Sequence, residues 1–212
     1  GSTSTDATSS GTAAAAAAVK PVCTTADYDQ EKLPFTATQQ QKDMLLWHNK
    51  ARTEPLTLVP DLEAMLLLFA GTDDKVYTVP GKTSIVTNEG KAAVNEAITF
   101  LKAATPIAAL KWDQLLEFAA KDLAVAQGLT TETGHTAPAN SDVGSSMSDR
   151  IAKYGQFVAT AGENIAYGTT GGKEIVLQLI IDDGVASRGH RDNIFKATFK
   201  NLGSWSSGHV TY

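Results

Sequence analysis

The chain has 212 residues, of which 42% are hydrophobic, and it carries a formal net charge of −5. This length and composition suit one globular domain with a core of its own. The acidic balance argues against sequence-independent binding of nucleic acid, which needs a basic face, and against electrostatic docking on an anionic membrane. The longest apolar run beyond the N-terminal segment, residues 64–70, is too short to cross a membrane, so no transmembrane segment is predicted.

The N-terminal segment is rich in Ser, Thr and Ala and has little apolar surface to bury. We therefore predict a disordered leader over residues 1–25 and a single domain over residues 26–212. Cys23 is the only cysteine, which excludes an intrachain disulfide, and we expect its thiol to have no role. Gly1-Ser2 is typical of a cloning remnant and no signal peptide is present, so the start of the sequence does not indicate location.

The first half of the domain is predicted to be helical. An apolar stripe follows Thr38 and ends before Pro55, which indicates one helix. A second helix is predicted over residues 60–71, because a proline opens it and a glycine closes it. Residues 72–87 are predicted to form a loop, and Asn88 is predicted to cap a third helix that runs through Leu101.

The second half of the domain mixes helices with irregular segments. The strongest helical pattern covers residues 112–127 and is closed by Gly128. A long irregular stretch follows over residues 130–145, and long loops in compact domains are often functional. A short helix is predicted over residues 148–154, and a strand over residues 164–167.

Two more helices and a hairpin are predicted near the C-terminus. The helices cover residues 173–183 and 189–195, and two strands over residues 202–206 and 209–212 are joined around Ser207-Gly208. Helices that outnumber strands in this order indicate an α+β fold.

Three short motifs carry the candidate chemistry. Each places His135, Glu163 or His190 directly after a glycine, where the backbone can turn sharply. Imidazole and carboxylate are both zinc ligands, so this set predicts a zinc site with His135 and His190 as metal ligands. An adjacent carboxylate can orient an imidazole N–H or accept a proton from bound water.

Each of these residues also has a simpler interpretation. His135 can be a turn residue, Glu163 a buried acid that accepts backbone N–H groups, and His190 a helix cap. Asp182 and Asp183 can be mere helix-end residues, although acids are unfavourable at a helix C-terminus. The sequence contains no G-x-S-x-G nucleophile elbow, no phosphate loop and no dinucleotide-binding motif, and its cysteine lies far from any histidine.

The order GH…GENIAYG…RGHRDNIF resembles the CAP superfamily of cysteine-rich secretory, antigen-five and pathogenesis-related proteins, whose domain is also called SCP. The resemblance is closest to the cysteine-poor branch of bacteria and protists and spans about residues 40–212. Further similar segments are His48-Asn49-Lys50-Ala51-Arg52, Leu110-Lys111-Trp112, Ser145-Ser146-Met147-Ser148-Asp149-Arg150-Ile151 and Ile180-Ile181-Asp182-Asp183-Gly184.

The resemblance implies a three-layer α-β-α sandwich with a cleft at one edge. It also implies a tetrad of two histidines and two acids. His135, Glu163 and His190 match three of its positions, and Asp182 or Asp183 matches the second acid, with Asp183 preferred. Because the last strand of such domains normally continues, the chain is expected to end early in its C-terminal strand.

The function implied is that of a secreted or cell-surface binding protein rather than an enzyme. Its ligand is expected to be a sterol, another small lipid or an extracellular protein, and no nucleic acid is expected. The loop over residues 72–87 is a candidate lining for a lipid groove. Two alternatives remain: a zinc-dependent, peptidase-like hydrolase that uses the same cleft, and a structural module whose tetrad is vestigial.

Overall fold

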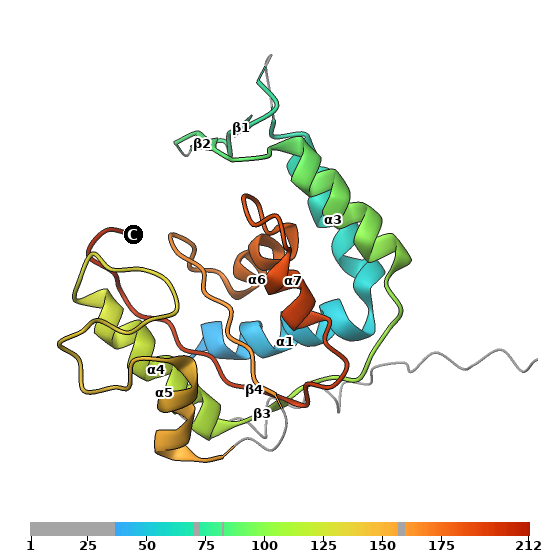
Figure 1. The fold of residues 1–212 in the computed structure, drawn as a ribbon. Helices are drawn as coiled ribbons and strands as arrows, with labels where there is room; N and C mark the ends of the chain where they lie inside the picture. The colour runs from blue at the N-terminus through green and yellow to red at the C-terminus, as the bar shows by residue number, and fades with distance from the viewer. Residues whose placement is uncertain (1–36, 70–72, 82, 157–159) are drawn as a thin grey trace, which may run out of the picture.

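The computed structural model describes residues 37–69, 73–81, 83–156 and 160–212. Its helices are α1 (Gln39–Thr53), η3 (Pro55–Leu58), α2 (Val59–Leu66), α3 (Lys91–Ala103), α4 (Gln114–Gly128), α5 (Met147–Tyr154), α6 (Gly172–Ile181) and α7 (Gly189–Ile194). Its strands are β1 (Val76–Tyr77), β2 (Ile85–Val86), β3 (Lys111–Trp112) and β4 (Asn201–Leu202). The fold is therefore mostly helical with two small sheets, as an α+β chain should be (Figure 1). The predicted leader and Cys23 lie outside the described residues.

The predicted helices are present, although α2 ends at Leu66, short of the predicted residue 71. Side-chain caps set the starts of α1, α4 and α5. Thr38 forms a capping box with Gln41 at α1, and Asp113 accepts the N–H groups of Leu115 and Leu116 at α4. The third helix begins at Lys91 instead of directly after Asn88. Its N-cap residue is Gly90, and the side-chain amide of Asn88 instead donates to the carboxylate of Asp183.

The predicted strands are mostly wrong. Residues 164–167 form no regular strand, and the predicted C-terminal hairpin is absent. Instead β4 pairs in parallel with β3, with Lys111 opposite Asn201 and Trp112 opposite Leu202. The loop predicted over residues 72–87 contains the antiparallel pair β1–β2.

The C-terminal segment runs along α4, and this contact replaces the hairpin. A Cβ atom on Gly203 would lie 2.1 Å from the backbone nitrogen of Glu117, near the start of α4. At the other end of α4, a Cβ atom on Gly128 would lie 2.2 Å from the carbonyl oxygen of Gly208. Because neither Gly203 of the segment nor Gly128 of the helix has a side chain, the segment approaches α4 closely at both ends.

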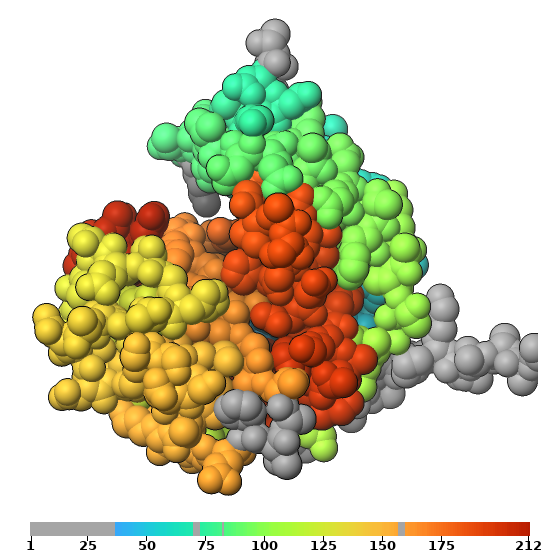
Figure 2. Space-filling model, in the orientation of Figure 1, coloured from blue at the N-terminus to red at the C-terminus, as the bar shows by residue number. Residues whose placement is uncertain are grey.

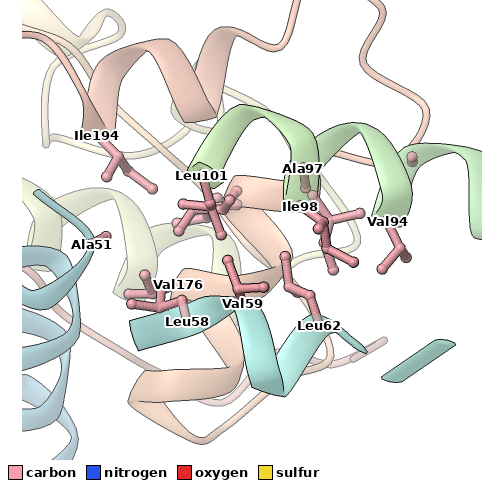
Figure 3. Close-up of a cluster of buried hydrophobic side chains, with 14 of the residues drawn as sticks. Ala51, Leu58, Val59, Leu62, Val94, Ala97, Ile98, Leu101, Val176 and Ile194 are labelled. Carbon is pink, nitrogen blue, oxygen red and sulfur yellow. The ribbon is translucent and has the colours of Figure 1, made fainter. Parts of the chain in front are cut away.

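Most of the buried apolar side chains form one core between α1, α2, α3, α6 and α7 (Figure 3). Within it α1 packs against α6, and α2 packs against α3. Leu62, Leu101 and Ile180 are fully buried there. Helices α4 and α5 pack against each other to one side, with the rings of Phe118 and Tyr154 5.5 Å apart. The three-layer sandwich stays a prediction.

Buried polar side chains of α1 fix two neighbouring loops. The amide of Asn49 exchanges two hydrogen bonds with the backbone of Leu110. The fully buried guanidinium of Arg52 donates to the carbonyl oxygens of Ala108, Ile194, Lys196 and Phe199. These bonds hold the loops that lead into β3 and β4.

Among the described residues, no helix combines the length and apolarity that crossing a bilayer requires.

Candidate functional site

His135 lies in the irregular segment between α4 and α5, and hydrogen bonds fix the backbone on both sides of it. The buried side chain of Gln127 donates to the carbonyl oxygens of Gly134 (2.6 Å) and Thr136 (3.3 Å). The hydroxyl of Tyr167 accepts the N–H of Gly134 at 2.8 Å and donates to Gln127 at 2.9 Å. Burial raises the pKa of Tyr167, so its hydroxyl stays protonated at neutral pH.

Glu163 connects His135 to a buried arginine. One carboxylate oxygen accepts the Nδ1–H of His135 at 2.9 Å, and the other accepts Nη2 of Arg150 at 2.7 Å. Arg150 is fully buried on α5, and its Nη1 also donates to the carbonyl oxygens of Ser145 and His135. The guanidinium therefore holds the carboxylate of Glu163 in place against the imidazole.

His190 lies in the first turn of α7 and is paired with Asp182. The Nδ1–H of His190 donates to one carboxylate oxygen of Asp182 at 2.6 Å, and its backbone N–H donates to the other at 2.9 Å. Asp182 closes α6 in the left-handed conformation, with φ of 55°. Asp tolerates this conformation better than most residues, and here it turns the carboxylate toward α7.

The two histidines face each other across the site. Their ring planes differ by 27°, and the ring centroids are 6.5 Å apart. Because the Nδ1 atom of each ring is hydrogen-bonded to a carboxylate, Nε2 is the ring nitrogen that remains to bind a ligand in both histidines. The His135 side chain is 58% exposed and that of His190 is 22% exposed, so the pair is open to solvent on one side.

The segment that carries Glu163 packs tightly on α7. A Cβ atom on Gly162 would lie 2.7 Å from Oδ1 of Asn193. Asn193 donates to Oδ1 of Asn164 at 2.8 Å, and Asn164 donates to the carbonyl oxygen of His190 at 3.0 Å. The glycine before Glu163 is therefore needed for close approach, and the two asparagines join the Glu163 segment to the His190 helix.

The structure brings together His135, Glu163 and His190, and it brings Asp182 rather than Asp183 to them. Asp183, which the sequence interpretation preferred, accepts the backbone N–H groups of Asn88 and Glu89, both at 2.7 Å. The two neighbouring carboxylates diverge because the left-handed turn at Asp182 ends the helical progression of side chains. His48 is buried and donates to the carbonyl oxygen of Met44, as expected for a packed histidine.

Two members of this site were missed by the sequence interpretation. Arg150 falls in the predicted helix over residues 148–154 and Gln127 in that over residues 112–127, and no site role is predicted for either. Arg150 lies in a segment that the resemblance had singled out, Ser145-Ser146-Met147-Ser148-Asp149-Arg150-Ile151, which was the available signal. Nothing in the sequence marks Gln127, since its partners lie in a loop without regular structure.

The donor set suits a divalent metal held by the two imidazoles, each oriented by a carboxylate. Among residues 37–69, 73–81, 83–156 and 160–212, no three His, Cys, Asp or Glu side chains are grouped as metal ligands. An ion held here would thus have two protein ligands, with its remaining positions open to water or substrate.

A cavity of about 270 Å³ lies between α1, α4 and α6, and Arg150 and Glu163 are among the residues that line it. Apolar side chains from these helices line it, among them Met44, Leu116, Leu123, Ile175 and Leu179. Arg150 Nε and Ser204 Oγ, two buried polar atoms without a partner among the described residues, belong to residues of its wall. The described part of residues 72–87 does not line this cavity, contrary to expectation.

The segments that carry the two histidines are exposed on one face of the molecule. In Figure 2 the segment around residue 135 is yellow and α7 is red-orange, and a notch separates the yellow segment from the green arm that carries β1 and β2. The pair thus joins a loop residue, His135, to a residue of helix α7, His190.

Comparison with known proteins identifies one family. The sequence profile described as CAP, the cysteine-rich secretory protein family, matches residues 47–208. No curated protein and no solved structure matches the chain significantly. The matched range includes His135, Glu163, Asp182 and His190.

Proposed function

The chain belongs to the CAP, or cysteine-rich secretory protein, family, and from that premise we propose that it is a secreted or cell-surface binding protein. We propose that its His135–His190 pair holds a divalent metal, zinc being the expected ion, and that its cavity takes a sterol or another small lipid. The single observation that carries the metal site is the pair of imidazoles whose Nδ1 atoms are both bonded to carboxylates. A single cysteine supports placement in the cysteine-poor branch.

The roles within the metal site follow from the contacts. Nε2 of His135 and of His190 would bind the ion. Glu163 and Asp182 would fix the tautomer and the ring orientation of the imidazoles. A bound zinc ion would supply a Lewis acid at the surface of the domain. Two protein ligands bind zinc more weakly than the closed four-ligand sites of structural zinc domains.

The proposal of a lipid ligand is supported by the cavity. Its lining is mainly apolar, which favours an apolar ligand. Arg150 Nε–H and the Ser204 hydroxyl, which have no partner among the described residues, belong to lining residues and would donate hydrogen bonds to hydroxyl or carbonyl oxygens of that ligand. A small amphiphile fits this distribution better than a fully apolar or a highly charged molecule.

Native mass spectrometry with and without added zinc tests the metal site. We expect one bound zinc per chain, lost in the double variant His135→Ala, His190→Ala and retained in His209→Ala, whose ring contacts the rings of Tyr167 and Tyr212. Absence of zinc from the wild-type protein would overturn the metal assignment. An organic extract of the same preparation, analysed for sterols and fatty acids, tests the cavity independently.

A second candidate function is a zinc-dependent hydrolase. The observation that favours it is the exposure of the His135 ring, which leaves room for a substrate beside Glu163. Glu163 would then act as the proton acceptor for a metal-bound water. Hydrolysis that survives in Glu163→Gln with zinc still bound would argue against this role.

A further inference from the structure

The loop between α6 and α7, residues 182–188, carries an unusual backbone at both ends. Asp182 and Arg188 have φ of 55° and 53°, and they are the only described residues other than glycine with positive φ. Such conformations persist in non-glycine residues only where surrounding contacts impose them. Asp182 is the hydrogen-bond partner of His190. The contacts that fix the backbone conformation of this loop therefore also fix the orientation of the His190 imidazole.

Arg188 closes the loop on itself. Its Nη1 donates to the carbonyl oxygens of Asp182 at 2.8 Å and Val185 at 3.2 Å. The guanidinium therefore joins the first residue of the loop to the last. The guanidinium contacts the backbone of Asp182, while the side-chain carboxylate of Asp182 accepts its hydrogen bonds from His190.

Two glutamates from the region of α3 hold the guanidinium. Glu89 accepts two parallel bonds from Nη1 and Nη2, both 2.7 Å. Glu96 accepts Nε at 3.0 Å and also Nη1 of Arg191 at 2.9 Å. Such bidentate pairs fix orientation as well as charge. The Arg188 side chain is only 13% exposed, so the network is partly shielded from solvent.

The same glutamate contacts the loop backbone directly. Glu89 Oε1 accepts the N–H of Gly184 at 2.8 Å, while Asp183 accepts the N–H groups of Asn88 and Glu89. A carboxylate from each of the two segments, the loop and the segment before α3, therefore accepts backbone N–H groups of the other. Hydrogen bonds from Arg188 hold the pKa of Glu89 at about 2, so the charge is present at neutral pH.

We propose that Arg188 is a positioning residue for the second histidine: held by Glu89 and Glu96, it imposes the left-handed turn that places the Asp182 carboxylate against His190. As a contribution to metal binding this inference rests on the function proposed above. As a statement about the alignment of His190 it stands without it. The three charged side chains of this network act through the loop and do not contact the imidazole.

The test compares Arg188→Gln with a second variant, Glu89→Gln, Glu96→Gln, which leaves the arginine in place if its removal prevents folding. Two quantities are measured: the low-field proton resonance of His190 Nδ1–H in ¹H NMR, and zinc affinity by isothermal titration calorimetry. We expect that resonance to broaden or vanish in both variants, while the Nδ1–H resonance of His135 persists. Zinc affinity should fall about tenfold or more, as for other groups that orient metal ligands.

Glu63→Gln is the matched control, because Glu63 also joins two elements through an exposed ion pair, with Lys102. It should leave both the resonance and the affinity unchanged. A His190 resonance of wild-type position and intensity in both network variants would overturn the proposal, whatever the zinc result. If the wild-type protein binds no zinc, the metal assignment fails while the resonance still decides whether Arg188 positions His190.

Discussion

Asp182 and Asp183 are adjacent in the sequence, yet their carboxylates bind different parts of the molecule. Asp182 accepts two hydrogen bonds from His190, and Asp183 accepts the backbone N–H groups that precede α3. One residue serves the candidate metal site, and the other ties that site to the arm that carries β1 and β2. Side-chain chemistry cannot distinguish them, since both are the same amino acid.

This divergence predicts different effects for the same substitution at the two positions. Asp182→Asn removes the charge that orients the His190 imidazole, so zinc affinity should fall about 10- to 100-fold. Asp183→Asn should weaken zinc binding much less. Titration calorimetry on both variants, with circular dichroism to verify folding, measures the difference. Equal losses at the two positions would contradict the assignment of Asp182 as the partner of His190.

Removal of Arg150 should destabilise the protein strongly. Arg150 is fully buried and is the ion-pair partner of Glu163. Arg150→Met would remove this positive charge and leave the mostly buried carboxylate of Glu163 without it. We expect the free energy of unfolding to fall by about 3 kcal/mol or more. Urea denaturation measures this change. Adding Glu163→Gln to Arg150→Met should recover part of the loss, and additive losses in that double-mutant cycle would show that the two side chains are not coupled.

His48 should make stability depend on pH. Burial lowers its pKa from 6.5 to about 4, so the folded protein keeps it neutral. As pH falls from 6.5 toward 4, only the unfolded chain gains this proton, and stability is lost over that window. The neutral, buried His48 thus contributes on the order of 3 kcal/mol to the free energy of unfolding, and this contribution is fully present above pH 6.5.

The variant His48→Gln tests this dependence. Urea denaturation at a series of pH values should show a slope in the wild-type protein that is reduced in His48→Gln. His209→Gln serves as the control, because His209 lies at the surface and contacts the carbonyl oxygen of Glu132. A wild-type slope that survives in His48→Gln would mean that another group is responsible.

Gly162 is predicted to tolerate no side chain. A methyl group there would meet the Asn193 amide, which is held by its bond to Asn164. Gly162→Ala should therefore lower the free energy of unfolding by about 1–3 kcal/mol. Gly189→Ala is the control, since a Cβ atom there would meet only Ser187 Oγ at an ordinary 3.5 Å. Thermal unfolding of both variants measures the contrast, and equal midpoints would argue against close packing at Gly162.

The sequence by itself determined where the helices lie and marked the starts of α1, α4 and α5. Apolar periodicity and the capping residues Thr38, Asp113 and Ser146 act over three or four positions, so their effect can be recognised without knowing the rest of the fold. The three glycine-flanked motifs likewise identified His135, Glu163 and His190 as residues that belong together, because the order of the motifs resembles a known family.

Tertiary structure decided what depends on partners distant in sequence. Asp182 rather than Asp183 faces His190 because a network from α3 imposes a left-handed turn. Arg150 joins the site because Glu163 approaches it from another segment. The C-terminal residues follow α4 instead of forming a hairpin because two glycines permit close contact with that helix. Each outcome depends on long-range packing and hydrogen bonding, which local sequence patterns do not encode.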